Sequence, residues 1–266
     1  MTVENLSTEH IYDYQSVAAI VTAMTNDEAR FLPEALKSVI ADPDIGQIIL
    51  CVEDKNNWLD AALGVLKNES RLKIISLPIM PIGSIRNKAL EHVRKPWVAY
   101  CDGDDVWCAG KTSIQLNYAY QTGADFVGAA HYLTDAEGII GAYGLSLYLP
   151  MTSSWLVRTE IMRQYPFNES MHQSSDGEWW IRTARLFRKV KCPSVLVRYR
   201  VRSSSVSAST PSKKRKHIII LFSKIPLVGK SIYFLTYCLW LYTRTQPYRW
   251  KSVWGKKGFP KYISLF

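Results

Sequence analysis

The sequence predicts an α/β fold: a mostly parallel sheet with helices on both faces, followed by a basic and aromatic C-terminal helical tail. Short apolar runs rich in Val, Ile and Ala alternate with segments of helical periodicity over residues 17–207. Several of these runs end in polar or acidic residues, as expected where the carboxyl ends of parallel strands meet at one edge of a sheet. We therefore divide the chain into an N-terminal extension (1–16), a folded domain (17–207) and a C-terminal region (208–266).

The first half of the domain predicts four strands that alternate with helices. The predicted strands are 17–24, 47–52, 72–77 and 97–102, and the predicted helices are 27–40, 58–66 and 85–93. We expect Asn26 to cap the first helix and Ser84 the third, because their side-chain oxygens accept hydrogen bonds from the free N–H groups of a helix start. The alternation predicts parallel strands joined by right-handed crossovers.

The second half is less regular and predicts a mixture of strands and helices. The predicted helices are 111–121, a short one from Thr159 to before Pro166, and 176–188; the predicted strands are 124–133, a short one after the turn at 135–138, 153–157 and 195–201. A Ser-rich and then basic linker follows at 203–216. The glycine-rich phosphate-binding motifs of dinucleotide oxidoreductases and P-loop NTPases are absent from the sequence.

The strand that begins at Trp97 ends in the acidic turn Asp102-Gly103-Asp104-Asp105. Gly103 lets the backbone turn tightly enough for Asp102 and Asp104 to face one point. Two carboxylates that hold a partly hydrated cation against substrate phosphates are the usual arrangement for Mg²⁺ or Mn²⁺. The alternative is an acidic turn without a metal, in which Asp104 or Asp105 caps the next helix.

Other polar side chains fall at neighbouring strand ends. We predict that Thr22 with Glu53 and Asp54 binds a ribose or a base, and that Arg86 pairs with a diphosphate. Parallel topology brings all of them to the edge that carries the acidic turn. Arg86 has the alternative of a solvated position on the helix surface.

The order of these motifs resembles that of family 2 glycosyltransferases, which have the GT-A fold. The matching stretches are 17–39, 49–57, 82–91, 97–115, 152–188 and 199–207. The resemblance implies a GT-A-like sheet and an inverting transfer of a sugar from a nucleotide-sugar, of the hexosyltransferase type. It also implies Mn²⁺ or Mg²⁺ as cofactor.

The resemblance also implies roles for single residues. Thr22, Glu53 and Asp54 match nucleoside-binding positions, and Arg86 lies in the loop near the diphosphate. The metal-binding motif corresponds to Asp102 and Asp104. The general base that takes the proton from the acceptor hydroxyl corresponds to Asp176.

Three positions depart from the family pattern. Glu53 replaces the more frequent aspartate. Ser175 replaces the first acid of the usual acidic pair before the base. Arg202 stands where the family often has a histidine that completes the metal shell, so we expect it to neutralise the diphosphate and to weaken the dependence on metal.

Three alternatives remain open at this point. Asp176 has the capping of its own helix as a second possible role. A nucleotidyltransferase shares the sheet and the paired aspartates but needs a glycine-rich basic start, and residues 22–31 contain no glycine. A non-catalytic membrane adaptor on a degenerate domain is the third.

The charge of the chain is unevenly distributed. Residues 1–178 carry 13 Lys and Arg against 23 Asp and Glu, whereas residues 179–266 carry 20 Lys and Arg and no acid. The longest uncharged run of the C-terminal region, 231–243, is shorter than the roughly 20 residues that cross a bilayer. The mixture of aromatic, aliphatic and basic residues in 213–266 predicts helices that lie on an anionic membrane surface, with packing on the domain as the alternative.

Partners and location follow from these features. We expect a nucleotide-sugar donor, with the UDP class ahead of GDP and dTDP, and a glycan or lipid-linked acceptor. We expect no nucleic acid partner, because no recognition module accompanies the basic charge. Five cysteines without metal-ligand spacing and a polar N-terminus predict a cytoplasmic protein at the inner face of the membrane.

Overall fold

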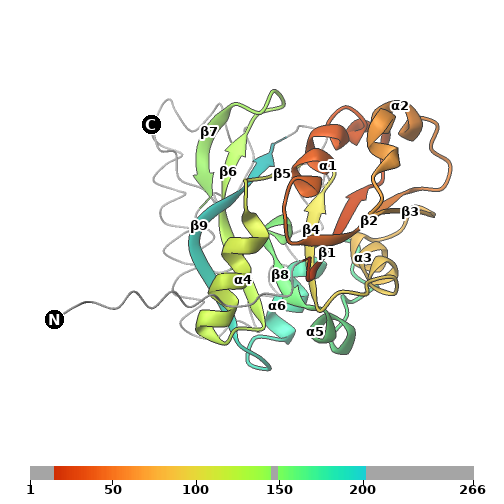
Figure 1. The fold of residues 1–266 in the computed structure, drawn as a ribbon. Helices are drawn as coiled ribbons and strands as arrows, with labels where there is room; N and C mark the ends of the chain where they lie inside the picture. Colours follow the sequence, from red (N-terminus) through yellow and green to blue (C-terminus); the bar gives the residue numbers. More distant parts are fainter. Residues whose placement is uncertain (1–14, 145–148, 202–266) are drawn as a thin grey trace, which may run out of the picture.

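The chain forms one mixed β-sheet in the computed structural model, which describes residues 15–144 and 149–201. Within these residues the sheet has nine strands in the order β3-β2-β1-β4-β8-β6-β9-β5, with β7 paired to β6 (Figure 1). The strands are β1 (Val17–Ala23), β2 (Ile45–Glu53), β3 (Leu72–Leu77), β4 (Trp97–Asp102), β5 (Val106–Trp107), β6 (Phe126–Thr134), β7 (Ile140–Gly144), β8 (Leu156–Arg158) and β9 (Lys189–Arg200). The helices are α1 (Leu32–Ile40), α2 (Leu59–Leu63), α3 (Ile82–Leu90), α4 (Lys111–Thr122), α5 (Thr159–Gln164) and α6 (Ser175–Arg182), with 3-10 turns η1 (Asn26–Glu28), η2 (Gly64–Asn68) and η3 (Thr152–Ser154).

The first four strands confirm the predicted parallel topology. Strand β1 lies between β2 and β4 and is parallel to both, and β3 is parallel to β2. The central position of β1 explains why all its residues are buried.

Helices cover both faces of the sheet, as predicted. Val17, Ala19 and Val21 of β1 pack into a core with residues of α1 and α4, while Ala18 and Ile20 pack into a second core with residues of α3, α5 and α6. Successive side chains of a strand point to opposite faces, so a strand with helices on both faces is apolar along its whole length.

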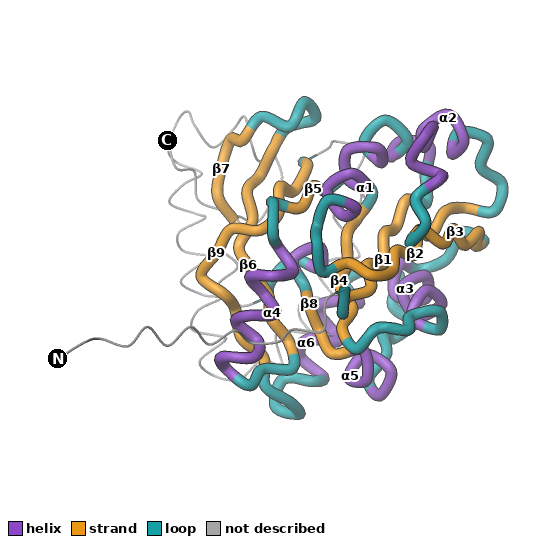
Figure 2. Tube along the Cα trace, in the orientation of Figure 1, coloured by secondary structure: helices purple, strands orange, loops and turns teal. Residues whose placement is uncertain are grey.

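The second half of the sheet is mixed, which Figure 2 shows as the strand layer from β4 across to β7 and β9. Strand β8 is antiparallel to both β4 and β6, and β6 is parallel to β9. The strand predicted at 153–157 is a 3-10 turn followed by the short β8, and β9 begins at Lys189 rather than at Val195. The two-residue β5 was not predicted; it exists because it pairs with β9.

Two predicted helix caps, Asn26 and Ser84, are wrong. Thr25, not Asn26, is the N-cap of η1, and the carboxylate of Glu28 accepts the main-chain N–H groups of Met24 and Thr25. The helix predicted over 27–40 therefore consists of η1 and a separate α1. Helix α3 begins directly after Pro81, so Ser84 is buried within its first turn rather than capping it.

Helix α4 is capped from another part of the chain. Its N-cap residue is Gly110, in the left-handed region, so neither Asp104 nor Asp105 caps it. Instead Asp42, in the loop before β2, accepts a hydrogen bond from the main-chain N–H of Thr112 at 3.0 Å and another from its hydroxyl.

Among the residues that the structure describes, none of the helices has the length and apolar character that crossing a bilayer requires.

Candidate functional site

Three of the predicted site residues, Thr22, Glu53 and Asp102, lie at the carboxyl ends of the parallel strands β1, β2 and β4. The register of β1 with β4 places Thr22 opposite Asp102. The hydroxyl of Thr22 donates to Oδ1 of Asp102 at 3.1 Å. Glu53 ends β2, the strand on the other side of β1, so it lies at the same edge of the sheet.

Arg86 lies behind Asp102. One guanidinium nitrogen of Arg86, Nη2, donates to Oδ1 of Asp102 at 2.6 Å, and the Arg86 side chain is 5% exposed, compared with 33% for Asp102. The guanidinium carbon is 5.8 Å from the ring centroids of both Tyr100 and Phe167. The alternative of a solvated Arg86 is therefore wrong, and the arginine fixes the orientation of the Asp102 carboxylate.

The acidic turn requires its glycine. A Cβ atom at position 103 would lie 2.7 Å from the Cβ of Ala23 and 3.0 Å from the carbonyl oxygen of Thr22, and the N–H of Gly103 donates to that same oxygen at 2.7 Å. The turn therefore packs directly on the end of β1, which keeps Asp102 and Asp104 at the sheet edge.

Asp105 is a structural member of the turn. It is fully buried, and its carboxylate accepts hydrogen bonds from the hydroxyl of Ser153 at 2.5 Å and from the main-chain N–H of Arg200 at 3.1 Å. Burial, followed by the charges of Asp104 and Asp102, raises the pKa of Asp105 well above its usual range. This carboxylate anchors the turn to η3 and β9.

Arg200 holds the other side of the turn and was not identified from the sequence. Its Nε donates to the carbonyl oxygen of Asp104 at 3.0 Å, and its Nη2 pairs with Glu34 of α1 at 2.6 Å. The Arg200 guanidinium also donates to the carbonyl oxygen of Ala136. Such contacts join residues far apart in the chain, so no local sequence pattern predicts them.

Asp176 is linked to the acidic turn by contacts with η3. Its Oδ2 lies 3.5 Å from the hydroxyl of Thr152, and the next residue, Ser153, accepts the main-chain N–H of Asp102 at 3.1 Å. Asp176 lies in the first turn of α6 and is half-buried. The preceding Ser174 has φ 59°, a left-handed conformation that non-glycine residues adopt at an energetic cost.

The remaining predicted residues are placed less closely or lie outside the described range. Asp54 is exposed, and its main-chain N–H donates to the carbonyl oxygen of Leu77 at 2.9 Å. Glu53 is half-exposed, and its carbonyl oxygen accepts the side-chain amide of Asn56 at 2.6 Å. Arg202 and the tail at 213–266 lie outside the described residues.

The acidic turn fits a divalent cation that is shared with a phosphate ligand. Both side-chain contacts of Asp102 fall on Oδ1, and the carboxylate oxygens at this edge are the hard ligands that Mg²⁺ and Mn²⁺ prefer. Over residues 15–144 and 149–201, no group of three or more His, Cys, Asp or Glu side chains is arranged to hold a metal ion. One or two carboxylates together with substrate phosphates are the usual set for Mg²⁺, whereas a cage made only by protein is not.

Comparison with known proteins identifies a family. Residues 19–184 match Glycosyl transferase family 2. An uncharacterized glycosyltransferase of Methanocaldococcus jannaschii is 23% identical over 194 residues, which cover 62% of this chain and 64% of that relative. This chain therefore spans somewhat less than two thirds of the relative's length.

Solved structures share the fold. The Staphylococcus aureus protein TarS (residues 1–349), in complex with UDP-GlcNAc, superimposes with a TM-score of 0.63 at 13% identity, covering 79% of this chain and 66% of that one. The mannosyltransferase PcManGT of Pyrobaculum calidifontis, in complex with GDP-Man and Mn²⁺, gives a TM-score of 0.62 at 13% identity, with coverage of 80% and 64%. The common fold is GT-A.

Proposed function

The chain belongs to glycosyl transferase family 2, and from this premise we propose that it transfers a sugar from a nucleotide-sugar, of the UDP-sugar class, to a hydroxyl group of a glycan or lipid-linked acceptor in polysaccharide or glycoconjugate synthesis. The observation that carries the proposal is the chain of contacts from Arg86 through Asp102 to η3 and Asp176. The nucleotide-sugars bound by TarS and PcManGT, UDP-GlcNAc and GDP-Man, support a nucleotide-sugar as the donor. Of the two, only UDP-GlcNAc supports the UDP class.

The donor end of the site is proposed to bind a nucleoside diphosphate. In the proposal, Thr22, Glu53 and Asp54 bind the nucleoside, and Asp102 with Asp104 holds a divalent cation, Mn²⁺ or Mg²⁺. When bound, such a cation supplies positive charge that stabilises the departing diphosphate. Arg86 keeps the carboxylate of Asp102 in place for this task. Arg202 is proposed to add positive charge at the diphosphate.

The acceptor end supplies the base. In the proposed single displacement, the acceptor oxygen forms a bond to the anomeric carbon while the bond from that carbon to the diphosphate oxygen breaks, which inverts the configuration. The proton of the acceptor hydroxyl passes to the carboxylate of Asp176. A carboxylate is an adequate base because an alcohol becomes acidic only as the new bond forms.

The proposal is tested by turnover of a panel of UDP-, GDP- and dTDP-sugars. We expect Asp104→Asn and Asp176→Asn each to lower the rate roughly 100-fold or more, the usual range for loss of a catalytic base or of charge stabilisation. The matched control is Asp60→Asn, because Asp60 lies on α2, its side chain is 78% exposed, and it has no role in the proposed site. We expect this variant to retain activity within about threefold, since an exposed carboxylate paired with Lys67 contributes little to the fold.

Two outcomes contradict the proposal. If Asp104→Asn and Asp176→Asn both retain activity, the assignment of the site is wrong. Absence of both turnover and nucleoside diphosphate binding in the intact protein favours the adaptor alternative. Chelation by EDTA followed by addition of Mn²⁺ measures how far the metal is needed, and full activity in EDTA supports a neutralising role for Arg202.

A further inference from the structure

Helix α3 turns one face towards the segment that leads to Asp176. Gly83 and Asn87 lie four residues apart, so they share a side of the helix. A Cβ atom at position 83 would lie 3.1 Å from the Cβ of Phe167 and 3.2 Å from the Cβ of Ser175. The helix therefore contacts both ends of the segment 167–175, at Phe167 and at Ser175. The missing side chain at Gly83 permits this close approach.

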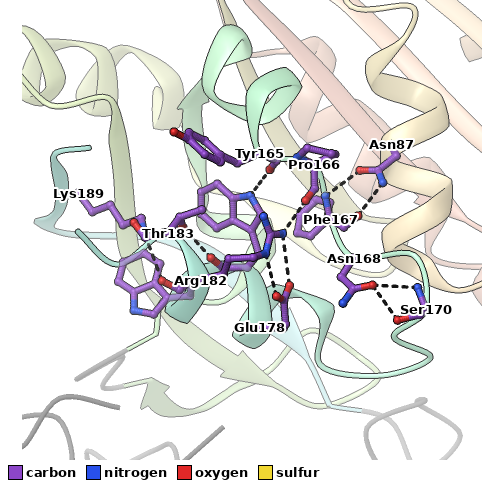
Figure 3. Close-up of polar contacts among 12 residues, drawn as sticks. Asn87, Tyr165, Pro166, Phe167, Asn168, Ser170, Glu178, Arg182, Thr183 and Lys189 are labelled. Carbon is purple, nitrogen blue, oxygen red and sulfur yellow. Dashed lines mark hydrogen bonds and ion pairs between the residues drawn. The ribbon is translucent and has the colours of Figure 1, made fainter. Parts of the chain in front are cut away.

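Asn87 binds the start of this segment with its whole carboxamide. Its Nδ2 donates to the carbonyl oxygen of Phe167 at 2.9 Å, and its Oδ1 accepts the N–H of Phe167 at 3.0 Å (Figure 3). Nδ2 also donates to Oε1 of Glu169 at 2.9 Å. Only a side-chain amide offers a donor and an acceptor in this arrangement, so the asparagine pairs with Phe167 much as a neighbouring strand would.

Helix α6 contacts the residues just before this point. Nη2 of Arg182 donates to the carbonyl oxygen of Pro166 at 2.7 Å (Figure 3). The indole N–H of Trp179 donates to the carbonyl oxygen of Tyr165 at 2.5 Å. The ring of Phe167 lies 5.9 Å from that of Tyr100. Residues 168–174 are exposed or half-exposed. They connect Phe167, which these contacts hold in place, to the start of α6 and Asp176.

We propose that Asn87 is a positioning residue for the acceptor half of the site: it fixes the segment 168–174 and, through it, the position of Asp176 and of the acceptor. The adjacent Arg86 holds Asp102 on the donor side. Two consecutive residues of α3 therefore set the distance between the two halves of the site. The inference rests on the proposed glycosyl transfer.

The test is Asn87→Asp in the full-length protein. The aspartate keeps the acceptor for the N–H of Phe167, removes both donated hydrogen bonds and places a like charge next to Glu169. We expect kcat for transfer to fall roughly 10- to 100-fold, as a misplacement of about 1 Å does. The Kd for a nucleoside diphosphate should stay within about twofold, and hydrolysis of the donor should rise relative to transfer. Arg86→Lys is the contrasting variant, because it should weaken nucleoside diphosphate binding.

A second substitution separates positioning from general damage to the fold. Glu169→Gln, added to Asn87→Asp, removes the repulsion and provides an amide that donates to the new carboxylate. We expect this double variant to recover at least about fivefold in kcat, with thermal unfolding within a few degrees of the wild type.

The possible results discriminate between the two proposals. If the wild type is active and Asn87→Asp either keeps its kcat or loses nucleoside diphosphate affinity in parallel, the positioning role is wrong and the glycosyl transfer stands. If the wild type neither binds nor turns over any nucleotide-sugar, the proposed function fails and the positioning role fails with it.

Discussion

Lys111 places an amine in the middle of the core. Its side chain is fully buried, Nζ donates to the carbonyl oxygen of Trp155 at 3.3 Å, and the same nitrogen lies 4.2 Å from the ring centroid of Trp107. Burial lowers the pKa of Lys111 from 10.5 to about 8, and the nearby carboxylate of Asp42 offsets part of this effect. Protonation of Lys111 therefore lowers the stability of the folded state relative to the unfolded chain.

The stability of the protein should consequently depend on pH through Lys111. Between the folded pKa of about 8 and the unfolded value of 10.5, the unfolded chain binds more protons, so the free energy of unfolding rises with pH in this window. From pH 7.5 to 9.5 we expect the wild type to gain roughly 2 kcal/mol more than Lys111→Met. Urea unfolding of both proteins at the two pH values measures the difference, and parallel pH profiles would contradict it.

At the residue scale, the sequence predicts the groups at the ends of strands but not their partners. Parallel strands bring Thr22 and Asp102 to the same edge of the sheet, as predicted. That the two residues lie directly opposite each other was not predictable, because β1 is apolar on both faces and its pattern does not set the register. Arg86 was expected to face a diphosphate, and the structure pairs it with Asp102. The roles of Asp105 and Arg200 depend on contacts between distant parts of the chain, which neither propensity nor motif spacing encodes.

At the scale of elements, helix α4 depends on a carboxylate from a distant loop. Asp42 is 3% exposed and satisfies the main-chain N–H and the hydroxyl of Thr112. Asp42→Ala should lower the free energy of unfolding by about 2 kcal/mol, because a helix cap is lost and a buried hydroxyl loses its partner. Denaturant unfolding measures this loss.

The matched control for this prediction is Asp60→Ala. Asp60 pairs with Lys67 at 2.6 Å, but the two side chains are 78% and 52% exposed, so solvent screens the pair. Its loss should change stability by less than about 1 kcal/mol. Equal effects of Asp42→Ala and Asp60→Ala would show that the cap does not stabilise α4.

Elements with a strong pattern of their own were predictable, and elements made by pairing were not. Strands β1, β2 and β4 were found because burial on both faces requires long apolar runs. The edge strand β3 was found from its shorter run of Leu and Ile, although Lys73 and Ser76 are exposed. Strand β5 has two residues and exists only through its ladder with β9, so no periodicity marks it. The split of the first helix reflects the local capping by Glu28, which competes with a continuous helix.

At the scale of the whole molecule, charge is separated along the chain. Every acidic residue lies within 1–178, and the sequence carries the basic cluster Lys213-Lys214-Arg215-Lys216 just before its most aromatic region. Basic clusters next to aromatic and aliphatic residues bind anionic membrane surfaces, and each Lys or Arg near the surface contributes about 1 kcal/mol. We propose on this basis that the region 213–266 holds the enzyme at an anionic membrane surface, near a lipid-linked acceptor.

Cosedimentation of the full-length protein with lipid vesicles tests this attachment. We expect binding to vesicles that contain phosphatidylglycerol, little binding to vesicles of phosphatidylcholine alone, and weaker binding in 0.5 M salt because the charges are screened over about 4 Å. Substitution of the four basic residues at 213–216 by glutamine should lower the affinity at least tenfold, given the contribution of each charge. The same variant should bind nucleoside diphosphate as the wild type does, because the proposed donor site includes none of these four residues. Unchanged vesicle binding by the glutamine variant would assign the attachment to other residues, and equal binding to neutral vesicles would show that apolar insertion rather than charge drives it.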